Sequence, residues 1–215
     1  IRYRLVGSEM CIRDRRRILL ISALLAGCSS APQNTDAFYV LPEFSAANIN
    51  STLVVQRTPL IVRPVELASY LADSGIVYRT SETQIVQAKH NQWAHSISEQ
   101  ITSRVINELR TKQTQYWPVE VNNLLDQSHK SKLQLSLSKF NGNFEGNAEL
   151  EGEWLIIDAN GKVTNSAPVN INVPLQNDGY DALVDALSEG LSNLTDQIAT
   201  KLWLFGLLDL SLIHI

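Results

Sequence analysis

The chain has 215 residues, of which 44% are hydrophobic, and a formal net charge of −4. This length suits one ordinary domain with a single core rather than two domains. From residue 28 to residue 205 there are 12 basic and 19 acidic side chains. Because an acidic domain repels phosphate backbones, we expect no nucleic acid partner.

Residues 1–27 have the pattern of a bacterial export signal. Four arginines at positions 13 and 15–17 precede an apolar run over 18–26, which is too short to span a bilayer. The run ends in Leu25-Ala26-Gly27-Cys28, which resembles the lipobox of bacterial lipoproteins. The resemblance implies cleavage before Cys28 and acyl chains such as palmitate on this residue. The alternative is an ordinary buried cysteine at the end of a hydrophobic helix.

The residues after Cys28 indicate where the processed chain is held. Ser29 follows the cysteine, and by resemblance to lipoprotein sorting rules this favours the periplasmic face of the outer membrane. Residues 28–37 form the lipidated cysteine and a polar tether, which reaches at most about 30 Å. Since the only cysteines are Cys11 and Cys28, the domain beyond the anchor has no thiol for a disulfide, a zinc site or a nucleophile.

Both ends of the sequence carry unusual segments. Residues 1–15 and the tail over 204–215 resemble translated sequencing-adapter remnants. The alternative is that Met10 is the true start and that the tail is a genuine apolar end. In either case these residues are left out of the fold prediction.

The first half of the domain mixes extended and helical patterns. β-Branched and apolar runs predict a strand over 52–55, an edge strand or bend over 59–65, and a hairpin formed by 76–79 and 84–87. Apolar residues then recur at helical spacing from Trp93 to Leu109. They predict an amphipathic helix from an N-cap at Asn91 through Lys112.

The second half begins with three alternating segments. Apolar residues at every second position predict strands over 133–137, 148–156 and 169–175, with turns at Gly142 and at Asn160-Gly161. A last amphipathic helix, capped by Asp178, has an apolar stripe from Tyr180 to Leu202. The predicted fold class is α/β (α+β): a single domain with a central mixed or antiparallel sheet and two long amphipathic helices packed on it.

We find no pattern typical of a catalytic, metal or cofactor site. His90 and His95 lie on different faces of a helix, and no metal-binding motif accompanies them. Glu149, Glu151 and Glu153 share one face of a predicted strand, as paired glycosidase carboxylates would. An open polar surface is the simpler interpretation, because nothing in the pattern buries one carboxylate and so separates its pKa from the others.

Four aromatic residues are candidate anchors for the core or for a partner. They are Tyr39, Tyr70, Trp93 and Tyr180. Buried packing is the default for a tryptophan on an apolar stripe, whereas tyrosine is often half-buried with its hydroxyl in contact with water.

The order of local patterns resembles the ABC-type transport auxiliary lipoproteins, the PqiC/YmbA-like group. The resemblance covers 38–203 and departs at Ala68, where a proline is common, and at Gln92, where an arginine is common. It rests on Phe38-Tyr39-Val40-Leu41-Pro42, on Val65 to Leu71 followed by Ile76-Val77-Tyr78-Arg79, on Asn91-Gln92-Trp93-Ala94, and on Asp178 to Leu183.

The resemblance implies a non-enzymatic accessory of intermembrane lipid transport. Its partners would be a periplasmic MCE-domain protein and, in some systems, an inner-membrane ABC transporter; it leaves open whether the domain forms a homo-oligomer. One alternative is a membrane-anchored hydrolase that uses acidic residues such as Glu149 and Glu151. Another is a structural lipoprotein that binds the cell wall or a Tol-type partner.

Overall fold

The computed structural model describes residues 35–43, 57–122 and 129–211, with side chains up to residue 204. The predicted export signal, Cys28, most of the predicted tether and the strand predicted over 52–55 lie outside the described residues. Within the part that is described, no helix combines the length and apolarity needed to cross a membrane.

An antiparallel meander of three long strands, as predicted, forms one side of the sheet. Its strands are β7 (Lys132–Asn143), β8 (Asn147–Ile157) and β9 (Val163–Pro174), with β7 at the centre of the sheet and β9 at the edge. The turns contain Gly146 and Gly161, both with positive φ, which glycine adopts at little steric cost. The turn predicted at Gly142 is wrong: this residue lies inside β7, where an added Cβ would come within 2.7 Å of the Tyr78 ring.

The other side of β7 pairs with three successive short strands in parallel. These are β2 (Thr58–Val62), β3 (Glu66–Leu67) and β4 (Gly75–Ser81), with a 3-10 helix, η2 (Ser69–Leu71), before β4. The strand predicted over 59–65 is shorter than expected, since β2 ends at Val62. Pro64 follows two residues later and has no N–H to donate to a neighbouring strand.

Three further strands widen the sheet at its two ends. β6 (Tyr116–Glu120) pairs with β2, β5 (Gln84–Trp93) forms the predicted hairpin with β4, and β1 (Ala37–Tyr39) pairs in parallel with β5. The described strands thus form one mixed sheet. Since Ala37 belongs to β1, the predicted tether ends one residue earlier than expected.

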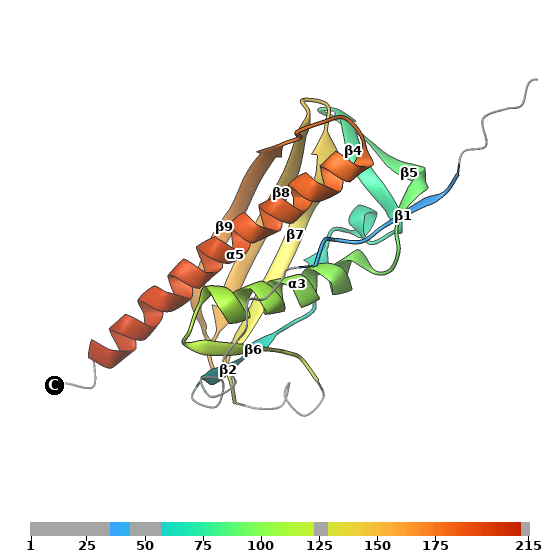
Figure 1. Ribbon diagram of the computed structural model, residues 1–215. Helices are drawn as coiled ribbons and strands as arrows, with labels where there is room; N and C mark the ends of the chain where they lie inside the picture. The colour runs from blue at the N-terminus through green and yellow to red at the C-terminus, as the bar shows by residue number, and fades with distance from the viewer. Residues whose placement is uncertain (1–34, 44–56, 123–128, 212–215) are drawn as a thin grey trace, which may run out of the picture. The chain divides into compact units, whose positions relative to one another are not determined.

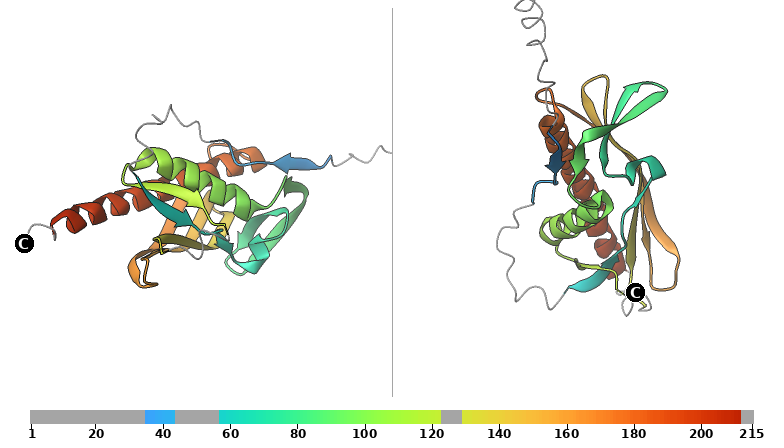
Figure 2. Two further views of the ribbon diagram at one scale, coloured as in Figure 1. Left: turned by 90° about the horizontal axis from the view of Figure 1, so that it is seen from below. Right: turned by 90° about the vertical axis from the view of Figure 1, so that its right-hand side faces the viewer.

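Two helices, α3 (Ile97–Lys112) and α5 (Tyr180–Ser211), cover one face of this sheet (Figures 1 and 2). The predicted start of α3 at Asn91 is wrong, because Asn91 and Trp93 continue β5 and pair with β1. Ser96 caps the helix instead, and its hydroxyl accepts a hydrogen bond from the Glu99 N–H.

The last helix begins and ends later than its pattern suggested. α5 begins at Tyr180, two positions after the predicted cap, Asp178. Gly179, which lies between them, has a positive φ and is therefore not helical. It continues to Ser211, beyond the stripe that ended at Leu202, and its last turns extend past the sheet (Figure 1).

The core lies between the helices and the sheet. The apolar stripe of each helix, which recurs about every 3.6 residues, packs against the apolar residues at every second position of the strands. Both sets of side chains are buried in the same core. The largest fully buried side chains are those of Trp154, Leu60, Ile61, Ile76, Ile101, Leu109, Leu133, Leu135, Leu137, Leu150, Leu183 and Leu187.

Candidate functional site

The sheet face opposite the helices carries a buried polar network around Glu149. Arg79 of β4 reaches across β7 and donates two hydrogen bonds to this carboxylate, with Nη2–Oε1 at 2.5 Å and Nε–Oε2 at 3.2 Å. Asn141 and Asn143 of β7 donate further bonds at 3.1 and 3.0 Å. Glu149 is only 5% exposed, although α3 and α5 both lie on the opposite face.

These contacts decide the ionisation of Glu149. Burial by itself would raise its pKa, but the hydrogen bonds from Arg79, Asn143 and Asn141 outweigh burial and hold the pKa below its usual range. The expectation that no carboxylate on this strand is buried is therefore wrong. Arg79, 70 residues away in sequence, is the residue that the sequence analysis missed.

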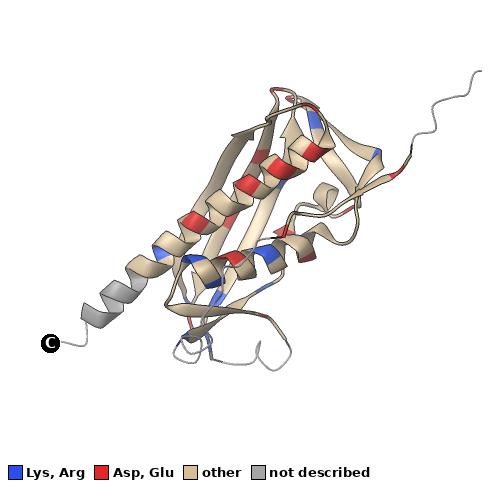
Figure 3. Ribbon diagram, in the orientation of Figure 1, with Lys and Arg blue, Asp and Glu red and all other residues tan. Residues whose placement is uncertain are grey.

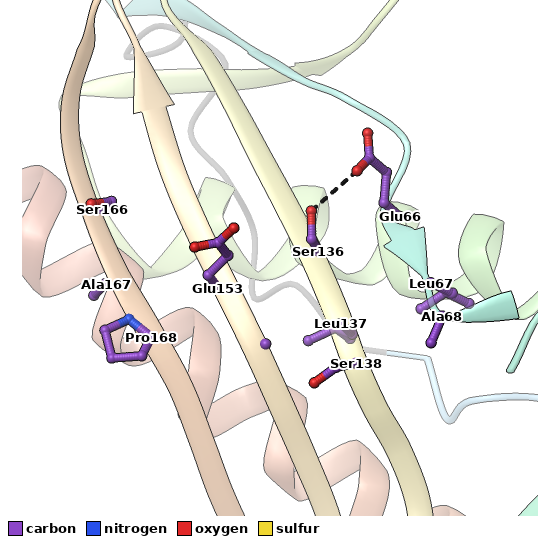
Figure 4. A pocket seen from close by; sticks show the side chains of 11 residues that line it. Glu66, Leu67, Ala68, Ser136, Leu137, Ser138, Glu153, Ser166, Ala167 and Pro168 are labelled. Atoms are coloured by element: carbon purple, nitrogen blue, oxygen red, sulfur yellow. Dashed lines mark hydrogen bonds between the residues drawn. The ribbon is translucent and has the colours of Figure 1, made fainter. Parts of the chain in front are cut away.

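The two neighbouring carboxylates differ in their surroundings. Glu151 accepts a hydrogen bond from Lys139 at 2.7 Å, whereas Glu153 is exposed and lines a groove across the sheet (Figure 4). The three glutamates share a face as predicted, but they do not act as equivalent groups.

The groove has a volume of about 590 Å³ and contains two carboxylates but no Lys or Arg. Ser136 at its centre is the register partner of both Glu66 and Glu153, and its hydroxyl donates to Glu66 at 3.3 Å. A Cβ added to Gly152 would fall 2.0 Å from the Ser136 carbonyl oxygen. Glycine is therefore required for the backbone to pass closely beneath the groove.

Three of the four predicted aromatic anchors lie together at β1. The rings of Tyr39 and Tyr180 have centroids 6.2 Å apart, and the Tyr39 hydroxyl donates to Asn91 at 3.1 Å. Trp93 pairs with Tyr39 in register and is buried against Phe140. These residues attach β1 and the first turn of α5 to the domain.

Tyr70 lies apart from the other anchors. It belongs to η2, and its hydroxyl donates to the Ser138 carbonyl at 2.6 Å. Burial, with the charges of Glu149 and Glu151, raises its pKa. The contact ties η2 to β7 beside the groove.

A second buried ionic cluster joins the two helices. The Glu108 carboxylate accepts hydrogen bonds from Arg104 at 2.6 Å and Thr195 at 2.5 Å, and Lys112 lies 3.0 Å from it. Burial would raise the pKa of Glu108, but these partners together lower it. The cluster fixes how α3 packs on α5, and the sequence analysis missed it.

His90 and His95 lie apart in the structure. His90 pairs with Asp36 at 2.8 Å, while His95 lines a separate groove against α3. Among the residues that the structure describes, no group of three or more His, Cys, Asp or Glu could hold a metal ion.

Several large apolar side chains of the described residues are exposed, including Ile85, Val86, Phe144 and Val163, and two further pairs lie toward the ends of the domain. Phe38 and Val40 of the β1 segment are 64% and 54% exposed, and Trp203 and Leu204 of α5 are 55% and 44% exposed. Between these ends, α5 presents a row of acidic residues, including Asp181, Asp185, Glu189 and Asp196 (Figure 3). The exposure of Trp203 could have been predicted from the sequence, because this residue falls outside the apolar stripe of its helix.

Known proteins show clear similarity to this chain. The ABC-type transport auxiliary lipoprotein component family matches residues 39–199. The "Intermembrane transport lipoprotein PqiC" of Escherichia coli K12 is 31% identical over 189 residues, which are 87% of this chain and 97% of that protein. PqiC of Shigella flexneri has the same identity and coverage.

Solved structures share the fold. A crystal structure of an uncharacterized protein has a TM-score of 0.66 and 26% identity, covering 78% of this chain and 99% of that one. A crystal structure from Xanthomonas campestris has a TM-score of 0.61 and 15% identity, covering 82% and 98%. With the family model matching most of the domain, this chain belongs to the ABC-type transport auxiliary lipoprotein family.

Proposed function

We propose that this chain is an outer-membrane lipoprotein, anchored through Cys28 on the periplasmic face, that serves intermembrane lipid transport as a docking component and catalyses nothing. Its partner is a periplasmic MCE-domain protein, which in some systems connects to an inner-membrane ABC transporter. The observation that carries the proposal is the family match over 39–199, joined by 31% identity to a relative named as an intermembrane transport lipoprotein.

The arrangement of the domain favours docking at the end away from the anchor. Asp36, at the start of the domain, is eight residues after Cys28, and the first turn of α5 packs beside β1 through Tyr180. From Tyr180 to Trp203 the helix rises about 36 Å. A partner that arrives from the opposite membrane meets this far end, where Trp203 is exposed.

Exposed tryptophan is the kind of residue that carries binding energy in protein interfaces. Hot spots are enriched in tryptophan because its large ring buries much area with little loss of side-chain freedom. We therefore place the partner contact at Trp203, not at the helix stripes that the core already uses.

The hydrolase alternative finds no support in the geometry. A general acid needs a raised pKa, whereas the pKa of Glu149 is lowered and its carboxylate is held by Arg79. Glu151 is paired with Lys139. Both candidate carboxylates thus serve ion pairs.

Co-purification tests the proposal. The full chain, expressed with its own signal and extracted in detergent, should elute with a periplasmic MCE-domain protein of the same organism. Trp203→Ser should weaken this association about ten-fold or more, equivalent to about 1.4 kcal/mol. Val163→Ser is the matched control, since Val163 is 50% exposed but lies on β9. Separate elution at micromolar concentration, with turnover of a glycan or ester by the lipoprotein alone, would overturn the proposal.

A further inference from the structure

The β1 segment, residues 36–41, exposes two large apolar side chains on its outward side. Side chains alternate along it: Tyr39 and Leu41 turn inward to the core, while Asp36, Phe38 and Val40 are exposed. Phe38 and Val40 expose 64% and 54% of their surface. β1 is short and is flanked by Asp36 and Pro42, features that discourage pairing with another strand. The two apolar side chains nevertheless remain exposed, and a lipid surface would bury them without any strand pairing.

The short stretch of chain between the predicted anchor and β1 indicates what Phe38 and Val40 contact. Asp36 follows Cys28 by eight residues, so even a fully extended chain holds Asp36 within about 29 Å of the lipidated residue. No other described part of the domain is joined to the anchor by so short a stretch of chain. The membrane that holds the lipid is therefore always within reach of Phe38.

Confinement makes a small apolar patch sufficient. A short flexible linker keeps two groups at an effective concentration in the millimolar range, so the patch needs only weak affinity for the lipid surface. Two residues would not hold a free protein on a bilayer, since even one myristoyl chain gives only marginal binding. Joined to an acylated cysteine, the same residues can set the orientation of the domain.

We infer that Phe38 and Val40 form a membrane-contact surface that lies in the headgroup region of the bilayer to which the chain is anchored. The inference rests on the proposed anchoring at Cys28. It orients the domain, with β1 against the lipid and α5 leading away toward Trp203. Because the domain is acidic and the patch is apolar, the contact uses phospholipid with no net charge and does not require anionic lipid.

The test couples the protein to a defined membrane without the cell's lipidation machinery. The chain from Cys28 onward has this residue as its single cysteine, so a maleimide-headgroup lipid in phosphatidylcholine vesicles attaches it at the natural position. Hydrogen–deuterium exchange of the peptide that contains 37–41 is then compared between coupled protein and protein whose thiol is blocked before the vesicles are added.

We expect coupling to slow exchange of this peptide about five-fold in the wild type and in Val163→Ser, a control of similar exposure on β9. The double variant Phe38→Ser/Val40→Ser should lose the protection while keeping the same melting midpoint. Vesicles that contain phosphatidylglycerol should give no stronger protection.

Three results would overturn the inference. The first is equal protection in the double variant, and the second is absence of protection in the coupled wild type. The third is protection that appears without vesicles as protein concentration rises, which would assign the patch to a second copy of the chain. Fatty-acid labelling at Cys28 in cells reports the anchoring itself, so failure of the patch and failure of the anchor are distinguished.

Discussion

Arg79 and Glu149 form a two-point ion pair across the central strand of the sheet, although 70 residues separate them in the chain. The side chain of Arg79 is 16% exposed and that of Glu149 6% exposed. The Arg79 guanidinium also lies 5.5 Å from the ring centroid of Phe144, which shields it from water. The pair joins β4 to β8 on the face opposite α3 and α5.

Arg79→Met should lower the free energy of unfolding by about 3–5 kcal/mol, because it leaves the Glu149 carboxylate buried without its cation. Lys139→Met is the control: it removes the partner of Glu151, in a pair whose side chains are 29% and 36% exposed, and should change stability by about 1 kcal/mol or less. Urea denaturation at pH 7 measures both. Equal effects of the two variants would contradict the structural role of Arg79.

The same pair shows why the sequence predicted some features and not others. The meander follows from period-2 alternation, which is local, so β7, β8 and β9 could be predicted. The burial of Glu149 depends on a partner 70 residues away, and the extension of β5 through Trp93 depends on pairing with β1, 54 residues earlier. A local helical pattern cannot reveal that such long-range pairing competes with it.

Two further elements were missed for local reasons. β6 contains Pro118 at its centre, which argues against a strand in the sequence, yet it pairs with β2 throughout its length. β1 has only three residues, too few for alternation to be significant. The groove beside Ser136 likewise depends on the close approach at Gly152, which composition does not show.

Acid should weaken the contact between α3 and α5 through Glu108. Its pKa is lowered in the folded state from an ordinary value of 4.5, so its stabilising contribution is complete above pH 4.5 and is lost as pH falls through the folded-state pKa. Glu108→Gln should therefore be less stable than wild type at pH 7, and the difference should shrink below about pH 4.5.

Thermal unfolding between pH 7 and pH 3 measures this difference. Glu189→Gln, a carboxylate on the exposed face of α5, serves as the control for the loss of one negative charge. A difference between wild type and Glu108→Gln that stays constant across the pH range would contradict the assignment.

Substitution by alanine should affect stability strongly at one tryptophan and hardly at all at another. Trp93 is buried and packs against Phe140, so Trp93→Ala should lower stability by about 3–5 kcal/mol. Trp203 is 55% exposed, and Trp203→Ala should change stability by about 0.5 kcal/mol or less. Denaturant titration measures both. An unchanged midpoint for Trp93→Ala, with lost partner binding, would instead make Trp93 an interface residue.

Cys28→Ala should abolish attachment of lipid and leave the chain unprocessed or released from the membrane. The reason is chemical: the proposed anchoring puts a thioether-linked diacylglycerol on the thiol at the end of Leu25-Ala26-Gly27-Cys28, and stable anchoring needs two or more acyl chains. Metabolic labelling with palmitate, followed by membrane fractionation, is the measurement. Cys11→Ala is the matched control, since it removes the other cysteine in the chain and should leave labelling unchanged. Label that persists in Cys28→Ala but disappears in Cys11→Ala would move the anchor, and with it the orientation proposed for β1.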